Sequence, residues 1–144
     1  MNVTDCIFCR IIDRAEPAQI IYENEDAVAI LDIHPIHFGH SLVIPKRHCS
    51  EFLQLPPASF QGVMTALSKV SRALVKGLNL EGFNIFSNNG VVAGQSVYHF
   101  HFHITPRYKD DNIKFVLQLK HYSDGELASC ADRIRTFLSS EQHT

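Results

Sequence analysis

Apolar residues recur along the chain at helical spacing in three places, which predicts three helices. The longest is expected over residues 57–78, where seven apolar residues lie at helical spacing: Phe60, Val63, Met64, Leu67, Val70, Leu74 and Leu78. A C-terminal helix is expected over residues 125–138, with these residues turned inward: Leu127, Ala131, Ile134 and Leu138. A short N-terminal helix would run through Ile11 and Ile12, with Asp5 as its N-cap.

Shorter apolar runs, several of them rich in β-branched residues, predict strands at residues 20–22, 27–31, 40–45, 83–87 and 97–105. The polar turn 23–26 joins the first two strands, and Pro106 is expected to end the last one. Hairpin-like strands beside segregated helices are typical of an α+β fold on a mainly antiparallel sheet. The length predicts a single domain over residues 1–144.

The composition narrows the classes of function. The chain has 13 Lys and Arg against 15 Asp and Glu, a formal net charge of −2, so we expect no nucleic-acid partner. No apolar run approaches the roughly 18 residues of a membrane span, so we expect no membrane partner either. Residues 1–13 lack the basic and apolar regions of a secretory signal, which predicts a cytoplasmic protein with reduced thiols.

Nine His are present, and three of them, His99, His101 and His103, alternate with apolar residues in one predicted strand. Alternation places the three imidazoles on one face, about 6.6 Å apart, and turns Phe100, Phe102 and Ile104 toward the core. The row could be a wet sheet face, a zinc-chelating strand, or a site where a His attacks phosphorus. Neutral imidazole suits the last role because it needs no deep deprotonation near pH 7.

The residues before this row favour phosphoryl or nucleotidyl transfer. Ala93-Gly94-Gln95-Ser96 offers small residues, main-chain N–H groups and a hydroxyl, which together can hold phosphate oxygens. Asn88 and Asn89 add neutral donors. A site that only binds a metal would not need a loop of hydrogen-bond donors before the His row.

Cys6 and Cys9 form a C-x-x-C near the N-terminus. A redox motif should follow a buried strand, and only five residues precede Cys6. Two buried thiols on a short helix, or half of a tetrahedral zinc site, remain as interpretations. Since no second C-x-x-C is present, the remaining zinc ligands would have to be His.

The segment from His99 to Thr105 has the form His-φ-His-φ-His-φ-φ and resembles the histidine triad (HIT) superfamily. Further similar segments are Asp5-Cys6-Ile7-Phe8-Cys9, Leu31-Asp32-Ile33, Gly39-His40-Ser41-Leu42-Val43-Ile44-Pro45-Lys46 and Gly94-Gln95-Ser96-Val97. The resemblance covers about residues 5–108, leaves a tail at 109–144, and is to the Hint branch in its bacterial form. It implies a five-stranded antiparallel sheet with a long helix and a homodimer. It also implies hydrolysis or transfer at the α-phosphate of a purine nucleotide.

The resemblance also implies roles for individual residues. His101 would be the nucleophile and form a nucleotidyl-histidine, with His103 donating to a phosphate oxygen. His40 would support the triad, His99 would complete it, and Ser96 would assist the leaving group. The expected nucleotide contacts are Asp32 on the ribose hydroxyls, Asn88 and Gln95 beside the phosphate, and apolar purine walls at Ile7, Phe8, Ile11, Leu31 and Ile33.

A structural zinc site is expected at Cys6, Cys9, His48 and His99, with Cys49 as a rival ligand and reduced thiols beside a wet His as the alternative. Pro45-Lys46-Arg47-His48 resembles zinc-binding bacterial members of the family. No metal is needed for the chemical step, since loop N–H groups and His103 can supply the positive field.

Two other functions stay open. Thr105-Pro106-Arg107-Tyr108 differs from the glycines that animal Hint proteins carry there and resembles Fhit-like members, so a diadenosine polyphosphate hydrolase is the alternative enzyme. A nucleotide-binding regulatory module with vestigial catalysis is the alternative without chemistry. The sequence does not decide the leaving group or whether AMP or GMP is preferred, because an apolar slot discriminates poorly between similar ligands.

Overall fold

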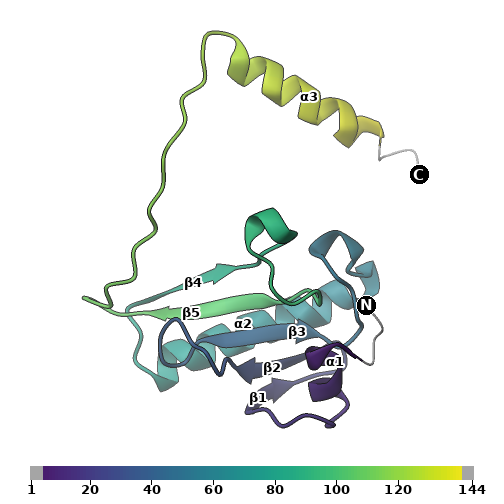
Figure 1. Ribbon diagram of the computed structural model, residues 1–144, viewed down its shortest axis with the longest axis vertical. Coiled ribbons are helices and arrows are strands. Elements are labelled where there is room, and N and C mark those ends of the chain that lie inside the picture. Colours follow the sequence, from purple (N-terminus) through teal and green to yellow (C-terminus); the bar gives the residue numbers. More distant parts are fainter. Residues whose placement is uncertain (1–4, 141–144) are drawn as a thin grey trace. The chain divides into compact units, whose positions relative to one another are not determined.

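The computed structural model describes residues 5–140, and the chain divides into two units, Met1–Asp111 and Asn112–Thr144. Over the described residues, the first unit holds the sheet, two α-helices and three 3-10 helices, and the second unit holds one α-helix (Figure 1). The 3-10 helices are Phe52–Gln54, Pro57–Ser59 and Val91–Ala93. Among the described residues, no helix is both long and apolar enough to cross a membrane.

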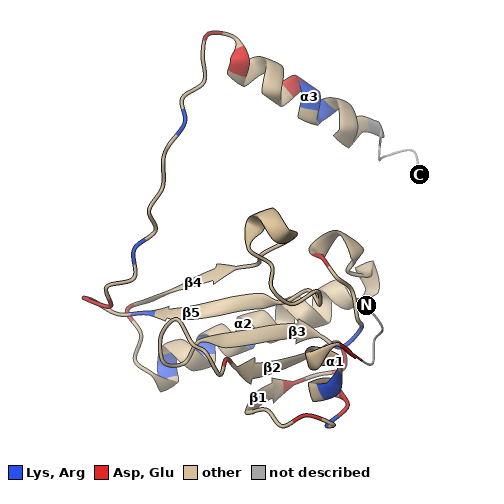
Figure 2. Ribbon diagram, viewed as in Figure 1, with Lys and Arg blue, Asp and Glu red and all other residues tan. Residues whose placement is uncertain are grey.

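A five-stranded antiparallel sheet organises the first unit, with the strand order β1-β2-β3-β5-β4 (Figure 1). Its strands are β1 (Ile20–Glu23), β2 (Ala27–Leu31), β3 (Ser41–Pro45), β4 (Gly82–Phe86) and β5 (Phe102–Arg107). The predicted α+β class and the five-stranded antiparallel sheet are confirmed. Strands β2 and β3 carry no charged residue (Figure 2), as expected for strands with both faces covered.

Two apolar clusters lie on the two faces of the sheet. Helix α2 (Phe60–Gly77) packs on one face, where Ala27, Ala29 and Val43 meet its Val63, Leu67 and Val70. On the other face, the helix α1 (Ile7–Ile12) packs Phe8, Cys9 and Ile11 against Val28, Ile30, Leu42 and Ile44. Successive residues of β2 and β3 therefore alternate between the two helices.

The predicted strand 97–105 is wrong at both ends, because β5 begins at Phe102 and continues through Pro106 to Arg107. The preceding segment does not join the ladder, since the N–H of Phe100 donates instead to the carbonyl of Cys49 at 2.7 Å. Pro106 is tolerated because β3 pairs only with residues 102–104, so no ladder partner flanks the proline on that side.

One smaller expectation about the helices is also wrong. The N-cap of α1 is Cys6 rather than Asp5, and it makes no side-chain capping bond. The described part of the second unit holds α3 (Glu126–Ser140), where a C-terminal helix was expected. Within this unit, Leu127, Ile134 and Leu138 of α3 have exposed side chains.

Gly39 places the start of β3 beside the C-terminal end of α2. It has a φ of +88°, and a Cβ here would lie 2.5 Å from Cδ1 of Leu78. Only glycine fits this conformation and this approach, so the turn that delivers His40 to the sheet depends on it.

Candidate active site

A cavity of about 390 Å³ lies between α1, the ends of β2 and β3, and the segment that leads into β5. Nine residues predicted for the site line it: Ile7, Phe8, Ile11, Leu31, Asp32, Ile33, Ser96, His101 and His103. The lining also includes seven that the prediction omitted: Glu16, Pro17, Ala18, Ile30, His34, Leu42 and Val97. The alternation along β2 and β3 could have indicated Ile30 and Leu42, whereas the 16–18 loop carries no periodic signal.

Four other residues that were predicted to be catalytic or to contact the nucleotide do not line the cavity. The side-chain amide of Gln95 is used within the protein, since it donates to the carbonyls of Ser50 (2.6 Å) and Val97 and accepts from the N–H of Gly90 (2.8 Å). Asn88 donates to the carbonyl of Gly94 at 3.3 Å. Both amides therefore shape the loop before the His row. His40 and His99 lie behind the cavity wall and contact the residues that form it.

The tautomer of His101 follows from a hydrogen bond to the main chain. Its Nδ1 lies 2.7 Å from the carbonyl oxygen of His99, and only a protonated nitrogen can donate to that oxygen. The lone pair of the neutral ring is therefore on Nε2. Since the ring lines the cavity, Nε2 is the atom that can act as a nucleophile there.

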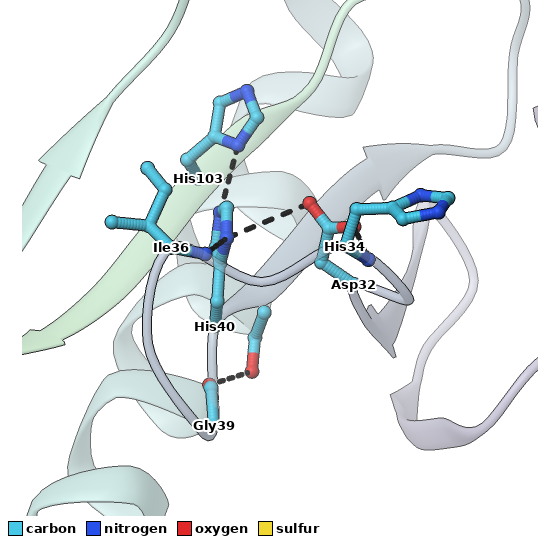
Figure 3. A network of polar contacts seen from close by, with 7 residues as sticks. Asp32, His34, Ile36, Gly39, His40 and His103 are labelled. Atoms are coloured by element: carbon cyan, nitrogen blue, oxygen red, sulfur yellow. Dashed lines mark hydrogen bonds and ion pairs between the residues drawn. The ribbon is translucent and has the colours of Figure 1, made fainter.

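A chain of hydrogen bonds fixes His40 and His103 in the same way (Figure 3). The N–H of Ile36 donates to Nδ1 of His40 at 3.1 Å, so the proton of the neutral His40 ring is on Nε2. That Nε2–H donates to Nδ1 of His103 at 2.9 Å, which leaves the proton of His103 on its own Nε2. This series of hydrogen bonds thus ends in the Nε2–H donor of His103. The ring centroids of His103 and His101 are 4.7 Å apart, so this donor lies beside the ring that carries the unprotonated Nε2.

Burial keeps these imidazoles neutral. It lowers the pKa of His103 to about 4, with further lowering from His101 and His40. Burial also lowers the pKa of His40 and of His101, although the nearby carboxylate of Asp32 opposes the shift in both. The 3.5 Å contact between Nδ1 of His40 and Asp32 would be an ion pair only with a proton on that nitrogen. We favour the neutral ring, because the N–H of Ile36 already points at Nδ1.

Asp32, His40 and His103 also form an oxygen- and nitrogen-donor cluster, which the geometry makes unsuitable for a metal. The two rings face each other at a hydrogen-bonding distance of 2.9 Å, and both nitrogens of His40 are engaged. One oxygen of Asp32 accepts from the N–H of His34 at 2.9 Å. The second oxygen retains acceptor capacity at the edge of the cavity.

A second cluster, Cys6, Cys9, His48 and His99, has its four ligand atoms within 4.8 Å of one another. Nδ1 of His99 lies 3.4 Å from Sγ of Cys6 and 3.2 Å from Nδ1 of His48, and Sγ of Cys9 lies 3.3 Å from Nδ1 of His48. The edges of a tetrahedral zinc site with two sulfur and two nitrogen ligands are about 3.3–3.8 Å long. The donor set and its spacing therefore fit zinc.

The surroundings of the cluster support the same fit. Nε2 of His99 donates to the carbonyl of Pro45 at 2.8 Å, which directs the lone pair of Nδ1 toward the cluster, as is usual for metal-binding His. Burial and the neighbouring Cys6 raise the pKa of the Cys9 thiol to about 12, so metal binding must displace a proton there. Cys49, the rival ligand, packs in the α2-side apolar cluster.

The expectation that the three His share one sheet face is wrong for His99. Because β5 starts only at Phe102, the chain at His99 is not pleated, and its ring points into the cysteine cluster. His101 and His103 do lie together. Phe8 contacts the ring of His101 edge-on at 5.0 Å, and Phe86 stacks on His103 at 4.6 Å.

Comparison of the amino-acid sequence with known proteins identifies a family and several relatives. A family model described as the HIT domain matches residues 13–110. The uncharacterized HIT-like protein MJ0866 of Methanocaldococcus jannaschii is 46% identical over 112 residues, 76% of this chain and 86% of its own. Adenylylsulfatase HINT3 of Arabidopsis thaliana is 35% identical over 96% of this chain and 73% of its own. Adenosine 5'-monophosphoramidase HNT1 of Saccharomyces cerevisiae is 36% identical over 71% of this chain and 62% of its own.

Two solved structures are similar in fold. A HIT family member from Bacillus subtilis has a TM-score of 0.85 at 35% identity and covers 92% of this chain and 96% of that chain. A Zn-bound histidine triad family protein from Mycobacterium smegmatis has a TM-score of 0.73 at 39% identity, with coverages of 79% and 83%.

Proposed function

Because the chain belongs to the histidine triad (HIT) family, we propose that it hydrolyses purine nucleotides at the α-phosphate, with nucleoside phosphoramidates or related adenylates as substrates. The observation that carries this proposal is the hydrogen-bond pattern from which the tautomers of two cavity residues are assigned. His101 presents an unprotonated Nε2, and His103 presents an Nε2–H beside it. A nucleophile next to a donor suits attack on phosphorus, where negative charge grows on the phosphate oxygens.

The reaction would proceed through a covalent intermediate. Nε2 of His101 attacks the α-phosphorus, the bond from phosphorus to the leaving group breaks, and the leaving group departs with a proton that solvent supplies through a hydroxyl relay. Ser96 lines the cavity and has a hydroxyl that can form this relay. Water then attacks the nucleotidyl-histidine and returns a proton to solvent, the phosphorus–nitrogen bond breaks, and a nucleoside monophosphate leaves. His103 donates to a phosphate oxygen in both steps.

The cavity supplies a place for the nucleoside. Ile7, Ile11 and Ile30 offer apolar walls for a purine ring. Asp32 stands at the edge and is held by the N–H of His34 on one oxygen, so its other oxygen can accept from the ribose hydroxyls. The names of two relatives, an adenylylsulfatase and an adenosine 5'-monophosphoramidase, support a substrate with an adenylyl group.

The Fhit-like alternative gains no support from Arg107. Its guanidinium donates to Asp111 at 2.6 Å and to Asn84 at 2.8 Å, and the residue is absent from the lining of the cavity. A regulatory module without catalysis would need neither the free Nε2 of His101 nor the donor of His103.

We also propose that Cys6, Cys9, His48 and His99 bind one structural zinc ion. The spacing of the four donors supports this, and so does the Zn-bound relative from M. smegmatis. Zinc would join α1 to the segments that carry His48 and His99. Elemental analysis of protein purified without chelator or a nickel column should give about one zinc per chain. A zinc content near zero, unchanged in Cys6→Ser, would reject the site.

A homodimer is the third part of the proposal. Strand β4 is a sheet edge with Phe83 and Ile85 exposed, and α2 exposes Met64 beside it. Together with Leu67 and Val75, these residues line a cavity of about 440 Å³. An unpaired edge next to an apolar helix face suits a self-complementary twofold contact.

The activity is tested by incubating the protein with adenosine 5'-phosphoramidate and measuring AMP release. His101→Ala should be inactive, and Cys130→Ser, on α3, is the matched control that should keep wild-type turnover. Comparing kcat/KM for the phosphoramidate and for a diadenosine polyphosphate separates the two enzyme classes. Equal, background-level release by wild type and His101→Ala would count against catalysis.

A further inference from the structure

One residue that lines the cavity carries a charge that the proposed reaction does not use. Glu16 lines the cavity with Pro17 and Ala18, in the loop that joins α1 to β1. Its side chain is 32% exposed, so it can be reached by solvent as well as by a molecule in the cavity. An acidic group among apolar walls favours ligands that offer it hydrogen-bond donors.

The order of the strands shows where this loop stands along the cavity. The lining runs across the sheet from His103 on β5 to Ile30 on β2. Residues 16–18 continue this line on the β1 side, because the N–H of Leu31 donates to the carbonyl of Gln19, the residue before β1, at 3.0 Å. Strands β1 and β5 are three strand spacings apart, about 14 Å. The loop therefore lies at the end of the cavity that is remote from the imidazoles.

A nucleotide bound as proposed would direct its base toward this loop. With the α-phosphorus at His101 and the ribose hydroxyls at Asp32, which follows β2, the purine is the part that extends to the β1 side. The outer edge of the ring, which carries the groups that distinguish one purine from another, then meets Glu16.

The carboxylate of Glu16 is held in place from two sides. The main-chain N–H groups of Ala15 and Glu16 both donate to the carbonyl of Arg10, at 2.8 and 3.1 Å, which fixes the loop to the last turn of α1. The guanidinium of Arg10 donates to Oε2 of Glu16. Because each carboxylate oxygen has two lone pairs, both oxygens can still accept from a ligand. Arg10 itself does not line the cavity, so the ligand meets the acceptor and not the cation.

We propose that Glu16 is a specificity-determining residue that contacts the outer edge of the base and makes the cavity prefer guanine to adenine. The inference rests on the proposed function and decides the base that the apolar walls leave open. A carboxylate only accepts hydrogen bonds. The outer edge of guanine presents two neighbouring donors, N1–H and the N2 amino group, whereas adenine presents the N6 amino group beside the N1 acceptor. The carboxylate can accept from both donors of guanine, but the N1 lone pair of adenine repels it.

The test is the affinity of the full-length protein for GMP, IMP and AMP, measured by isothermal titration calorimetry at neutral pH. GMP should bind about tenfold more tightly than AMP, since one additional hydrogen bond to a charged but partly exposed acceptor is worth about that factor. IMP has the N1–H but lacks the N2 amino group, so its affinity should lie between the two. Equal affinities for GMP and AMP in the wild type would overturn the proposal.

Two substitutions of glutamate separate contact from charge. Glu16→Gln replaces one acceptor by a donor, which matches the N6 amino group and N1 of adenine, so the preference for GMP should disappear or reverse. Glu25→Gln removes the same charge from an exposed position outside the cavity and should keep the wild-type preference. A structural defect in Glu16→Gln would weaken AMP and GMP binding alike, whereas the proposal requires the ratio of the two affinities to change. An unchanged ratio would overturn it.

The readout is the binding of a reaction product and needs no turnover. A preference for GMP in a protein that hydrolyses neither the adenosine nor the guanosine 5'-phosphoramidate would overturn the proposed activity alone. Hydrolysis of both phosphoramidates with equal kcat/KM would overturn the base preference alone.

Discussion

The main-chain N–H of Ile36 determines which ring nitrogen carries the proton in His40 and, through it, in His103. Ile36 has an exposed side chain, and its N–H forces Nδ1 of His40 to accept. Every later assignment follows from that bond: His40 donates to His103, and His103 presents a donor to the cavity. No side-chain pattern in the sequence could have indicated this, because the group that acts is common to all residues except proline.

The role of this N–H can be tested by removing it. Ile36→Pro deletes the donor, whereas Ile36→Ala keeps it and changes only the exposed side chain. We expect kcat to fall about five- to tenfold in the proline variant, since one hydrogen bond is worth about 1–1.5 kcal/mol. The ¹⁵N signals of His40 should show a mixture of tautomers. Wild-type kinetics in Ile36→Pro, with the fold intact by circular dichroism, would reject this role.

Phe86 gives a prediction for pH dependence. Its stacked ring helps to bury His103, and burial lowers the pKa of that imidazole to about 4. In Phe86→Ala, water should reach the ring, and the pKa should rise toward 6.5. The acid limb of kcat/KM that belongs to His103 should then move to higher pH. An NMR titration of His103 that is identical in both proteins would contradict this.

The same shift affects stability, and its sign follows from proton linkage. A His whose folded pKa is lowered binds fewer protons in the folded state than in the unfolded state between pH 4 and 6.5. The free energy of unfolding should therefore fall as the pH drops from about 6.5 to about 4. In Phe86→Ala, this part of the pH dependence should become smaller, which urea unfolding at several pH values would measure.

At the scale of elements, the pattern of apolar and polar residues predicted the strands of the sheet well. It failed for the residues before Phe102, which lie outside β5. Phe100 and Ile104 are buried as expected, and β1 to β4 lie where the apolar runs placed them. Only the orientation of the His99 ring was predicted wrongly, because its surroundings are set by Cys6, Cys9 and His48, which are distant in sequence. The C-x-x-C predicted that further ligands of a zinc site would be His, and the family resemblance named His48.

The turn at Gly39 allows a direct test of how α2 and β3 are joined. Gly39→Ala adds a methyl group 2.5 Å from Leu78 at a φ of +88°, and should destabilise the protein by about 1–3 kcal/mol. Gly77→Ala is the matched control, since nothing lies within 4 Å of its added Cβ and alanine favours a helix. Thermal unfolding that ranks the two variants equally would show that the contact is unimportant.

At the scale of the whole molecule, the family resemblance of the sequence implied a homodimer, and nothing in the fold described above tests it. The structure adds the exposed edge of β4 next to α2. Sedimentation at micromolar concentration should give about twice the 16.3 kDa of one chain. Ile85→Lys, which places a charge on the edge strand, should shift the protein toward monomer. A wild-type monomer would contradict the dimer.

The central claim is that Nε2 of His101 forms a bond to the α-phosphorus, and the most direct measurement is the intact mass of the protein quenched during turnover of adenosine 5'-phosphoramidate. We predict a species heavier by one adenylyl group, labile to acid as expected for a phosphorus–nitrogen bond, with the label on His101 after proteolysis. Ser96→Ala should still form it, whereas His101→Ala should not. Turnover by wild type with no labelled protein under rapid quench, or a label that persists in His101→Ala, would contradict the account.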